Sequence, residues 1–366
     1  MKQKYISLKV MPFISLIIII LLIGIVQVFN NHGYNYEKGK YFIFFWVFSF
    51  DSIIWGSEIG IHYKQYLSIV IKWFEIVVFL VSLSSIISIS SSILSGNISR
   101  IYGGVNYQAA SYFSAFAFGL SIYYSFSGKE SIRFSVFQSK FYQSISHIVI
   151  VLLGFCVIVP GGRGAFVLMI VYMLLGSWAW LRENKHSKKF YIWLMLILCI
   201  LPFVLYTLYF VIQINESIYT GFQRAISFID FKRGGFDLAG GSSGRDRIYQ
   251  QAFDLISKKP FNGYGLFEYM YHLTTVNQYP HNFFLELLLQ GGVFYFAAMV
   301  IFLTFLFSKL IKLIKRDLQF VIVLFLFAYP MTNLMFSGSY LDTPLFWYCV
   351  MIVFSAPKYE KSEKNV

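Results

Sequence analysis

Long apolar stretches separated by short polar segments run through this chain from end to end. A transmembrane helix needs about 20 mostly apolar residues, and about ten stretches approach that length. The predicted spans are 11–29, 41–56, 67–94, 108–127, 144–160, 165–181, 190–212, 283–307, 318–336 and 344–356. The pattern predicts an all-α, polytopic membrane protein whose single transmembrane domain occupies residues 1–366.

The polar interval 213–281 interrupts this pattern and predicts one large loop outside the membrane. Lys and Arg gather in alternate loops, and the lysines of the N-terminal segment fall on the same side as the basic groups near 185 and 312. Basic loops are retained in the cytoplasm, so both termini are expected there and 213–281 on the outer face. The stretch 11–29 is long and lacks a small-residue cleavage site, which indicates a retained first helix.

Composition agrees with a membrane protein, because 57% of the residues are hydrophobic and only 13% are charged. The net charge of +13 follows from basic loops between spans, so we expect no nucleic-acid partner. The three cysteines lie in apolar spans without a CxxC or Cys/His spacing, which predicts neither a disulfide framework nor a metal site.

Charged residues within spans are costly and are often functional. Lys72 and Glu75 are spaced to pair on one helix, so an ion pair is expected there. Asp51 stays open between a structural and a functional role.

The predicted loop contains an amphipathic helix. Ser242 or Ser243 is expected to cap it, and Pro260 to end it. Arg245 and Tyr249 share one stripe of this helix, four residues apart. The predicted apolar face carries Ile248, Ala252, Leu255 and Ile256, and the turn that follows the helix is Asn262-Gly263-Tyr264-Gly265.

Three features of the predicted outer face can carry chemistry. Arg163 lies among three glycines with no acidic neighbour in the sequence, Arg245 opens the amphipathic helix, and His281 stands where the chain re-enters the membrane. A guanidinium matches phosphate oxygens, and a neutral imidazole can take a proton from a hydroxyl. The alternatives are a snorkelling arginine, loop cations that serve solubility, and a helix cap at Asn282 beside an interfacial histidine.

Four segments together resemble the O-antigen polymerase and ligase superfamily, the Wzy polymerases and WaaL ligases. They are GGRGAFV, SGRDRIYQQAF, KKPFNGYG and HNFFLELLLQGG, between Pro160 and about Phe307. The resemblance implies a GT-C-like glycosyltransferase of the bacterial inner membrane with its active site on the periplasmic face. Its donor would be an undecaprenyl-diphosphate-linked oligosaccharide, used without a metal or other cofactor.

The same resemblance implies roles for individual residues. Arg163 and Arg245 would hold the lipid-linked pyrophosphate, and His281 would activate the acceptor hydroxyl. The residues that adjoin these motifs complete the expected substrate-binding set: Arg247, Tyr249, Tyr264 and Asn282. The other expected partners are membrane lipid and a chain-length regulator protein. The external segments contain no Asp-x-Asp pair, as expected of a transferase that needs no metal.

The expected activity is polymerisation, in which the growing glycan moves to the non-reducing-end hydroxyl of a lipid-linked repeat unit. By analogy, a short first half rich in Phe, Ile and Tyr favours this branch. One alternative is a ligase that transfers the glycan to lipid A-core. A flippase or exporter for lipid-linked glycan is the alternative from another class, although it would need polar residues along a path through many spans.

Overall fold

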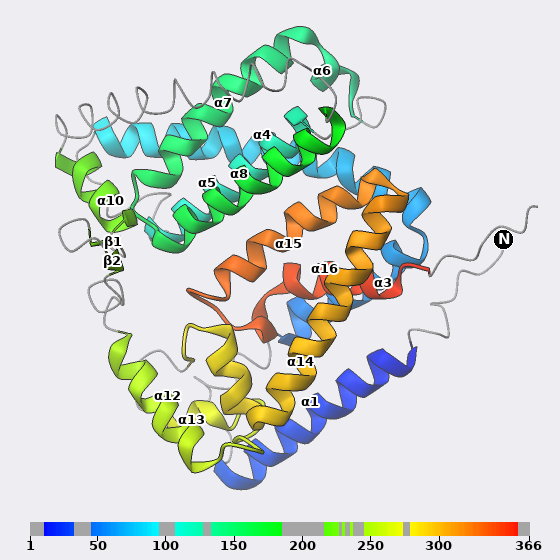
Figure 1. Ribbon diagram of the computed structural model, residues 1–366, viewed down its shortest axis with the longest axis vertical. Coiled ribbons are helices and arrows are strands. Elements are labelled where there is room, and N and C mark those ends of the chain that lie inside the picture. Colours follow the sequence, from blue (N-terminus) through cyan, green and yellow to red (C-terminus); the bar gives the residue numbers. More distant parts are fainter. Residues whose placement is uncertain are drawn as a thin grey trace, which may run out of the picture. The chain divides into compact units, whose positions relative to one another are not determined.

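A computed structural model describes residues 11–32, 45–94, 107–126, 133–184, 216–226, 229–230, 235–236, 245–273 and 279–357 (Figure 1). Helices dominate these ranges. The first part of the chain holds α1 (Met11–His32), the π-helix η1 (Phe45–Ser49), α3 (Phe50–Ile61), α4 (Tyr63–Leu94), α5 (Tyr107–Phe126), α6 (Ser135–Gln138), α7 (Lys140–Ile158) and α8 (Arg163–Asn184).

The second part begins with α10 (Glu216–Ile226) and a two-residue antiparallel pair, β1 (Ile229–Asp230) and β2 (Gly235–Phe236). It continues with α12 (Asp246–Lys258), α13 (Tyr269–His272), α14 (Phe283–Arg316), the 3-10 helix η4 (Leu318–Phe320), α15 (Val321–Asn333), the 3-10 helix η5 (Tyr340–Asp342) and α16 (Pro344–Ser355).

Four of these helices are long and apolar enough to cross a membrane, namely those at Tyr63–Ile93, Lys140–Ile158, Arg163–Arg182 and Phe283–Arg316. Shorter apolar helices lie at Leu318–Asn333 and Pro344–Ser355. The prediction of a helical membrane protein is thereby confirmed. The predicted span 190–212 lies outside the described residues, and the total of about ten spans stays a prediction.

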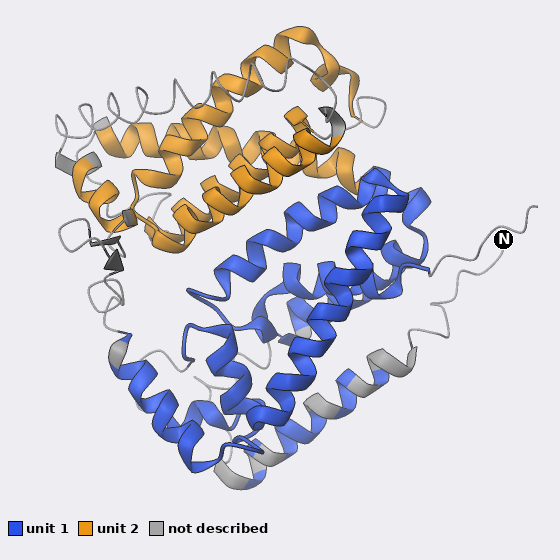
Figure 2. Ribbon diagram, viewed as in Figure 1, with its two compact units in different colours: residues 1–69, 244–366 blue, residues 70–243 orange. Residues whose placement is uncertain are grey.

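The chain divides into two compact units, 1–69 with 244–366 (unit 1) and 70–243 (unit 2) (Figure 2). In unit 1, α3 packs closely on α16. A Cβ on Gly56 would lie 2.6 Å from the carbonyl oxygen of Tyr348, and one on Gly60 would lie 2.5 Å from that of Ile352. Both positions need glycine because the two helix backbones approach too closely for a side chain.

In unit 2, α5 packs against both α7 and α8. Here too a glycine allows the contact, since a Cβ on Gly119 would lie 2.3 Å from the Tyr172 ring. The two helices therefore pack closely by placing a small residue opposite a large one.

The expected ion pair between Lys72 and Glu75 is wrong. Glu75 is 1% exposed and accepts from Arg133, whose Nη2 and Nε lie 2.6 and 2.7 Å from Oε1. The Lys72 ammonium instead lies over the Phe134 ring, 5.8 Å from its centroid. Arg133 satisfies the buried acid better because its planar fork donates two hydrogen bonds, which a lysine three residues away on the same helix cannot match.

Candidate functional site

Two glycine motifs of the sequence form a single joint in unit 1. Inside α14, Gly291 and Gly292 leave helical geometry, and Gly292 has φ +63°. Because of the kink, carbonyl groups of α14 just before it lose the amide donors that a regular helix would provide one helical turn later. The turn that follows α12 supplies replacement donors. Tyr264 N donates to Leu289 O at 2.8 Å, and Gly265 N donates to Gln290 O at 2.7 Å.

A hydrogen bond in the reverse direction, from α14 to the turn, completes this joint. Val293 N donates to Pro260 O at 2.8 Å. A Cβ on Gly263 would lie 2.5 Å from Gly291 N, and one on Gly292 would lie 2.3 Å from the carbonyl of Phe261. The backbone of the turn after α12 thus packs directly on the backbone of α14, which fixes the position of α12 relative to that helix.

The predicted amphipathic helix is present as α12. Ile248 and Ala252 are buried, while Leu255 and Ile256 pack against the core of this region, so the predicted apolar face is confirmed. The predicted serine cap is wrong, because α12 begins at Asp246 with Arg245 in the N-cap position and no side-chain cap. Ser242 and Ser243 themselves lie outside the described residues. The helix ends at Lys258 before Pro260, and the predicted turn follows it.

His281 occupies an unusual position between α13 and α14. It is the only non-glycine residue with positive φ, +52°, in the described part of the chain. Its side chain is 8% exposed and packs on Tyr279, with the ring centroids 4.4 Å apart. Neither ring nitrogen has a hydrogen-bond partner among the described residues. A strained backbone and an unsatisfied buried imidazole are features that collect at functional sites.

The electrostatic surroundings keep this imidazole neutral. The pKa of His281 is lowered to about 4, mainly by burial and to a smaller extent by the nearby Arg245 guanidinium. Burial acts by disfavouring the charged ring, and Arg245 acts by repelling a second positive charge. The structure therefore brings together two of the three residues that the sequence selected for chemistry.

Asn282 caps α14, so the capping alternative from the sequence is confirmed. Its Oδ1 accepts from Phe284 N at 3.0 Å and from Leu285 N at 3.1 Å. These two bonds satisfy amides at the start of the helix that have no partner within it. The cap also sets the point at which the chain turns from His281 into α14.

Arg163 belongs to unit 2, where it is the first residue of α8 and half-buried. Its Nε donates to the backbone oxygen of Arg224 on α10, at 3.2 Å. The glycines before it are required: Gly161 has φ +81°, and a Cβ on Gly162 would lie 2.5 Å from the Ser111 Cβ. Arg163 is thus held in a tight turn against α5 and α10 of unit 2, whereas Arg245 and His281 belong to unit 1.

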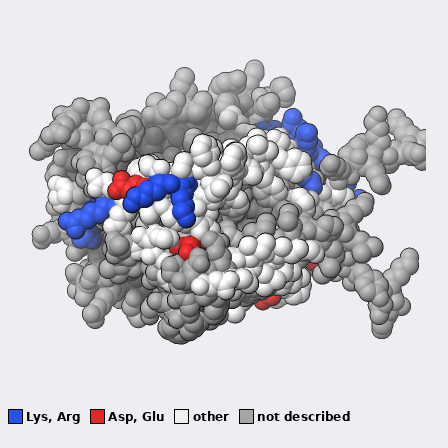
Figure 3. Space-filling view, turned by 90° about the horizontal axis from the view of Figure 1, so that it is seen from below, with Lys and Arg blue, Asp and Glu red and all other residues white. Residues whose placement is uncertain are grey.

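The remaining predicted binding residues lie along α12 and its turn. Arg247 is exposed, whereas Tyr249 is partly buried against the core of this region. Tyr264 is buried, its hydroxyl donates to Leu255 O at 3.1 Å, and the Lys259 ammonium lies 4.6 Å from its ring centroid. Among the described residues on the face seen in Figure 3, charged side chains are sparse and mostly basic.

A buried polar network beside the joint was missed by the sequence reasoning. Glu286, 1% exposed, accepts at Oε1 from Tyr269 Oη at 3.0 Å, from Gln290 Nε2 at 3.3 Å and from Ser339 Oγ. Tyr340 extends the network by donating to Gln290 Oε1. The sequence does place an acid, Glu286, and an amide, Gln290, within a predicted apolar span. Burying such groups is costly unless they have polar partners, so their presence could have predicted this network.

A protein-family model matches part of this chain. Residues 148–300 match the family model Wzy_C, described as O-antigen ligase. The predicted resemblance to the O-antigen polymerase and ligase superfamily is thereby confirmed. The Wzy_C region covers less than half of the chain, yet it contains Arg163, Arg245, His281 and every other predicted site residue. No curated protein and no solved structure matches the chain.

Proposed function

We propose that this protein is a polymerase for O-antigen or a related surface polysaccharide. It would transfer the growing glycan from undecaprenyl diphosphate to the non-reducing-end hydroxyl of a lipid-linked repeat unit. The observation that carries the proposal is His281, a buried and neutral imidazole beside Arg245 within the Wzy_C region. We place the site on the periplasmic face of a bacterial inner membrane, with both termini in the cytoplasm, because the loop charges follow the positive-inside rule.

The reaction needs a base and a site for a departing diphosphate. His281 takes the proton of the acceptor hydroxyl, whose oxygen attacks the anomeric carbon of the donor sugar. The bond from that carbon to the diphosphate oxygen breaks, and undecaprenyl diphosphate leaves with the electron pair. Arg245 and Arg163 stabilise the negative charge on this leaving group, and no nucleotide sugar takes part.

The charges around His281 link donor binding to base strength. A pKa of about 4 makes the imidazole a weak base in the substrate-free protein. A diphosphate on Arg245 would offset the positive charge that lowers this pKa and add a negative charge close to the ring. Both changes raise the pKa of His281, so the base becomes effective when the donor is in place.

Complementation of a deletion strain, read on a sugar-ladder gel, tests these roles. His281→Ala and Arg163→Ala should each abolish chain extension while the protein still inserts in the membrane. Arg163→Lys should restore little, because an ammonium does not reproduce the guanidinium fork. Arg182→Gln, at the other end of α8, is the matched control and should preserve the ladder. Normal long chains from the His281→Ala strain would refute the catalytic role.

A ligase is the second candidate, and the description of the matching family favours it. The deletion strain separates the two activities. A single repeat unit on lipid A-core indicates that a polymerase is lost, whereas a core without any repeat indicates that a ligase is lost. Unextended lipid-linked units trapped on the inner leaflet would instead indicate a flippase.

A further inference from the structure

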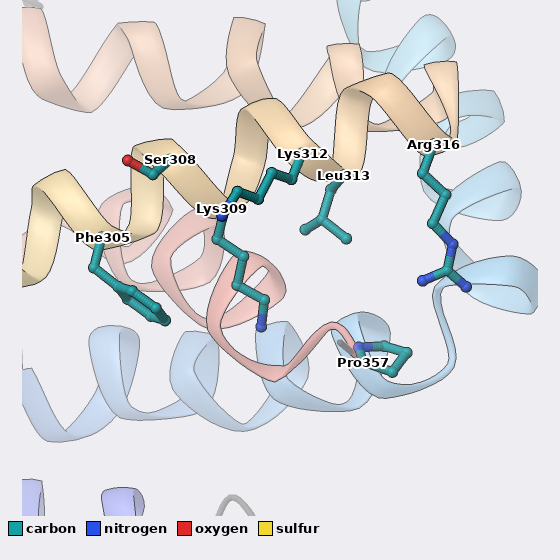
Figure 4. A pocket seen from close by; sticks show the side chains of 7 residues that line it. All are labelled: Phe305, Ser308, Lys309, Lys312, Leu313, Arg316 and Pro357. Atoms are coloured by element: carbon teal, nitrogen blue, oxygen red, sulfur yellow. The ribbon is translucent and has the colours of Figure 1, made fainter. Parts of the chain in front are cut away.

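A second cationic site lies in unit 1 at the far end of α14. A cavity of about 280 Å³ is lined there by Phe305, Lys309, Lys312, Leu313, Arg316 and Pro357, together with one serine. Lys309 and Arg316 reach from α14 toward the segment that follows α16, with Leu313 between them (Figure 4). Three cations line this cavity, and none of the side chains that line it is acidic.

The cavity lies at the basic end of one face of α14, along which the residues change from apolar to basic. Residues 301, 305, 309, 312 and 316 recur every three or four positions, so they lie on one face of the helix. The first two are Ile301, 69% exposed, and Phe305, 45% exposed. The other three are basic. An apolar surface that leads into a cationic cavity matches an amphiphile with a negatively charged head.

Neighbouring groups hold the cations in place. Lys309 Nζ donates to Phe354 O at 2.7 Å near the end of α16, and the Arg316 guanidinium lies 5.6 Å from the Tyr63 ring centroid. The nearest acid along the helix is Asp317, whose Oδ1 accepts from Gln319 N at 3.0 Å as it caps η4. The positive charges are therefore organised around the cavity, and the adjacent carboxylate has a role of its own.

We propose that this cavity binds the phosphate headgroup of an anionic phospholipid, with an acyl chain lying along Phe305 and Ile301. Basic pockets beside membrane helices are suited to such headgroups. The site is distinct from the proposed catalytic one, because α14 is 34 residues long and carries Asn282 at its other end. At about 1.5 Å per residue, a helix of that length spans the whole bilayer, so the two sites lie at opposite membrane faces. The proposal does not depend on the transferase activity.

Lipid binding to the purified full-length chain tests the proposal. Phosphatidylglycerol, phosphatidylcholine and inorganic phosphate are each titrated into the detergent-solubilised protein, and the Tm is followed. Phosphatidylglycerol should raise the Tm, and the other two should not. In Lys312→Gln/Arg316→Gln, the phosphatidylglycerol concentration needed for half of the shift should rise about tenfold or more.

Controls separate lipid binding from folding and from general charge. Lys315→Gln removes a neighbouring cation that does not line the cavity, and it should retain the wild-type response. Lys312→Gln alone keeps the Arg316–Tyr63 contact, so it reports on binding if the double variant does not fold. An unchanged response in the cavity variants would overturn the proposal, as would an equal shift with phosphatidylcholine. An equal shift with inorganic phosphate would assign the cavity to a free anion and overturn the lipid.

Discussion

Two buried glutamates, one in each unit, have partners of opposite kinds. Both side chains are 1% exposed within long apolar helices. Glu75 in unit 2 faces a cation, since Arg133 binds its Oε1 with Nε and Nη2 and also donates to Tyr124 O at 3.3 Å. Glu286 in unit 1 is held by neutral donors: Tyr269, Gln290, Ser339 and the backbone N–H of Tyr340.

The difference shows two ways of placing an acid in an apolar interior. A charged pair concentrates the stabilisation in one contact, so removing either partner leaves the other charge buried without compensation. A network of neutral donors spreads it over several elements, here α13, α14 and the segment at η5, and each donor contributes a modest share. We therefore expect the same substitution to have unequal effects at the two sites.

The largest effect is expected from Glu75→Gln. The amide keeps the shape of the side chain but leaves the Arg133 guanidinium, 6% exposed, without a counter-charge. Breaking a buried ion pair from one side costs about 3–5 kcal/mol. Thermal unfolding of the purified protein in detergent measures this loss, and Lys72→Gln is the control because Lys72 is not the partner of Glu75. A loss no larger than that of the control would show that Arg133 does not depend on the charge of Glu75.

The second largest effect is expected from Gly292→Ala, which disrupts the backbone packing between α14 and the turn after α12. The new Cβ would meet the Phe261 carbonyl at 2.3 Å, at a residue with φ +63°. Left-handed strain and overpacking together should cost on the order of 3 kcal/mol. The matched control is Gly154→Ala in α7, where a Cβ would lie 3.7 Å from the Phe118 ring. Equal unfolding temperatures for the two variants would rule out a rigid joint.

Local features of this region could be predicted from the sequence because their causes are local. The apolar face of α12, the stop before Pro260 and the capping capacity of Asn282 all depend on residues within a turn or two. The helical membrane class follows from the length of the apolar runs. For the same reason, the sequence could select His281 and Arg245 as candidates from their residue types and positions alone.

Features set by distant contacts could not be predicted. Glu75 and Arg133 are 58 residues apart, and the nearer Lys72 offered a plausible partner that the fold does not use. The joint between the turn after α12 and the α14 kink needs two glycine motifs whose contact no local pattern reveals. The serine cap was wrong because α12 starts at Asp246, beyond both serines.

A smaller loss is expected from Glu286→Gln. The amide oxygen can still accept from Tyr269, Gln290 and Ser339, and no buried cation is stranded. The new NH₂ group cannot accept from the Tyr340 N–H, so one buried donor loses its partner, at about 1–2 kcal/mol. Unfolding measured beside Glu75→Gln makes this the direct test of the comparison. A loss as large as that of Glu75→Gln would mean that the charge of Glu286, and not only its shape, stabilises unit 1.

The smallest effect on stability is expected from Asn282→Ala, at the start of the helix that carries Glu286. The substitution removes one acceptor from the amides of Phe284 and Leu285, which costs about 1 kcal/mol. Asn282→Asp restores the cap and should recover stability. The same pair separates capping from substrate binding, because Asp would also place a negative charge beside His281 and repel an anionic donor. If Asn282→Asp recovers both stability and chain extension, Asn282 serves only as a helix cap. If it recovers stability without chain extension, the result supports a role for Asn282 in substrate binding.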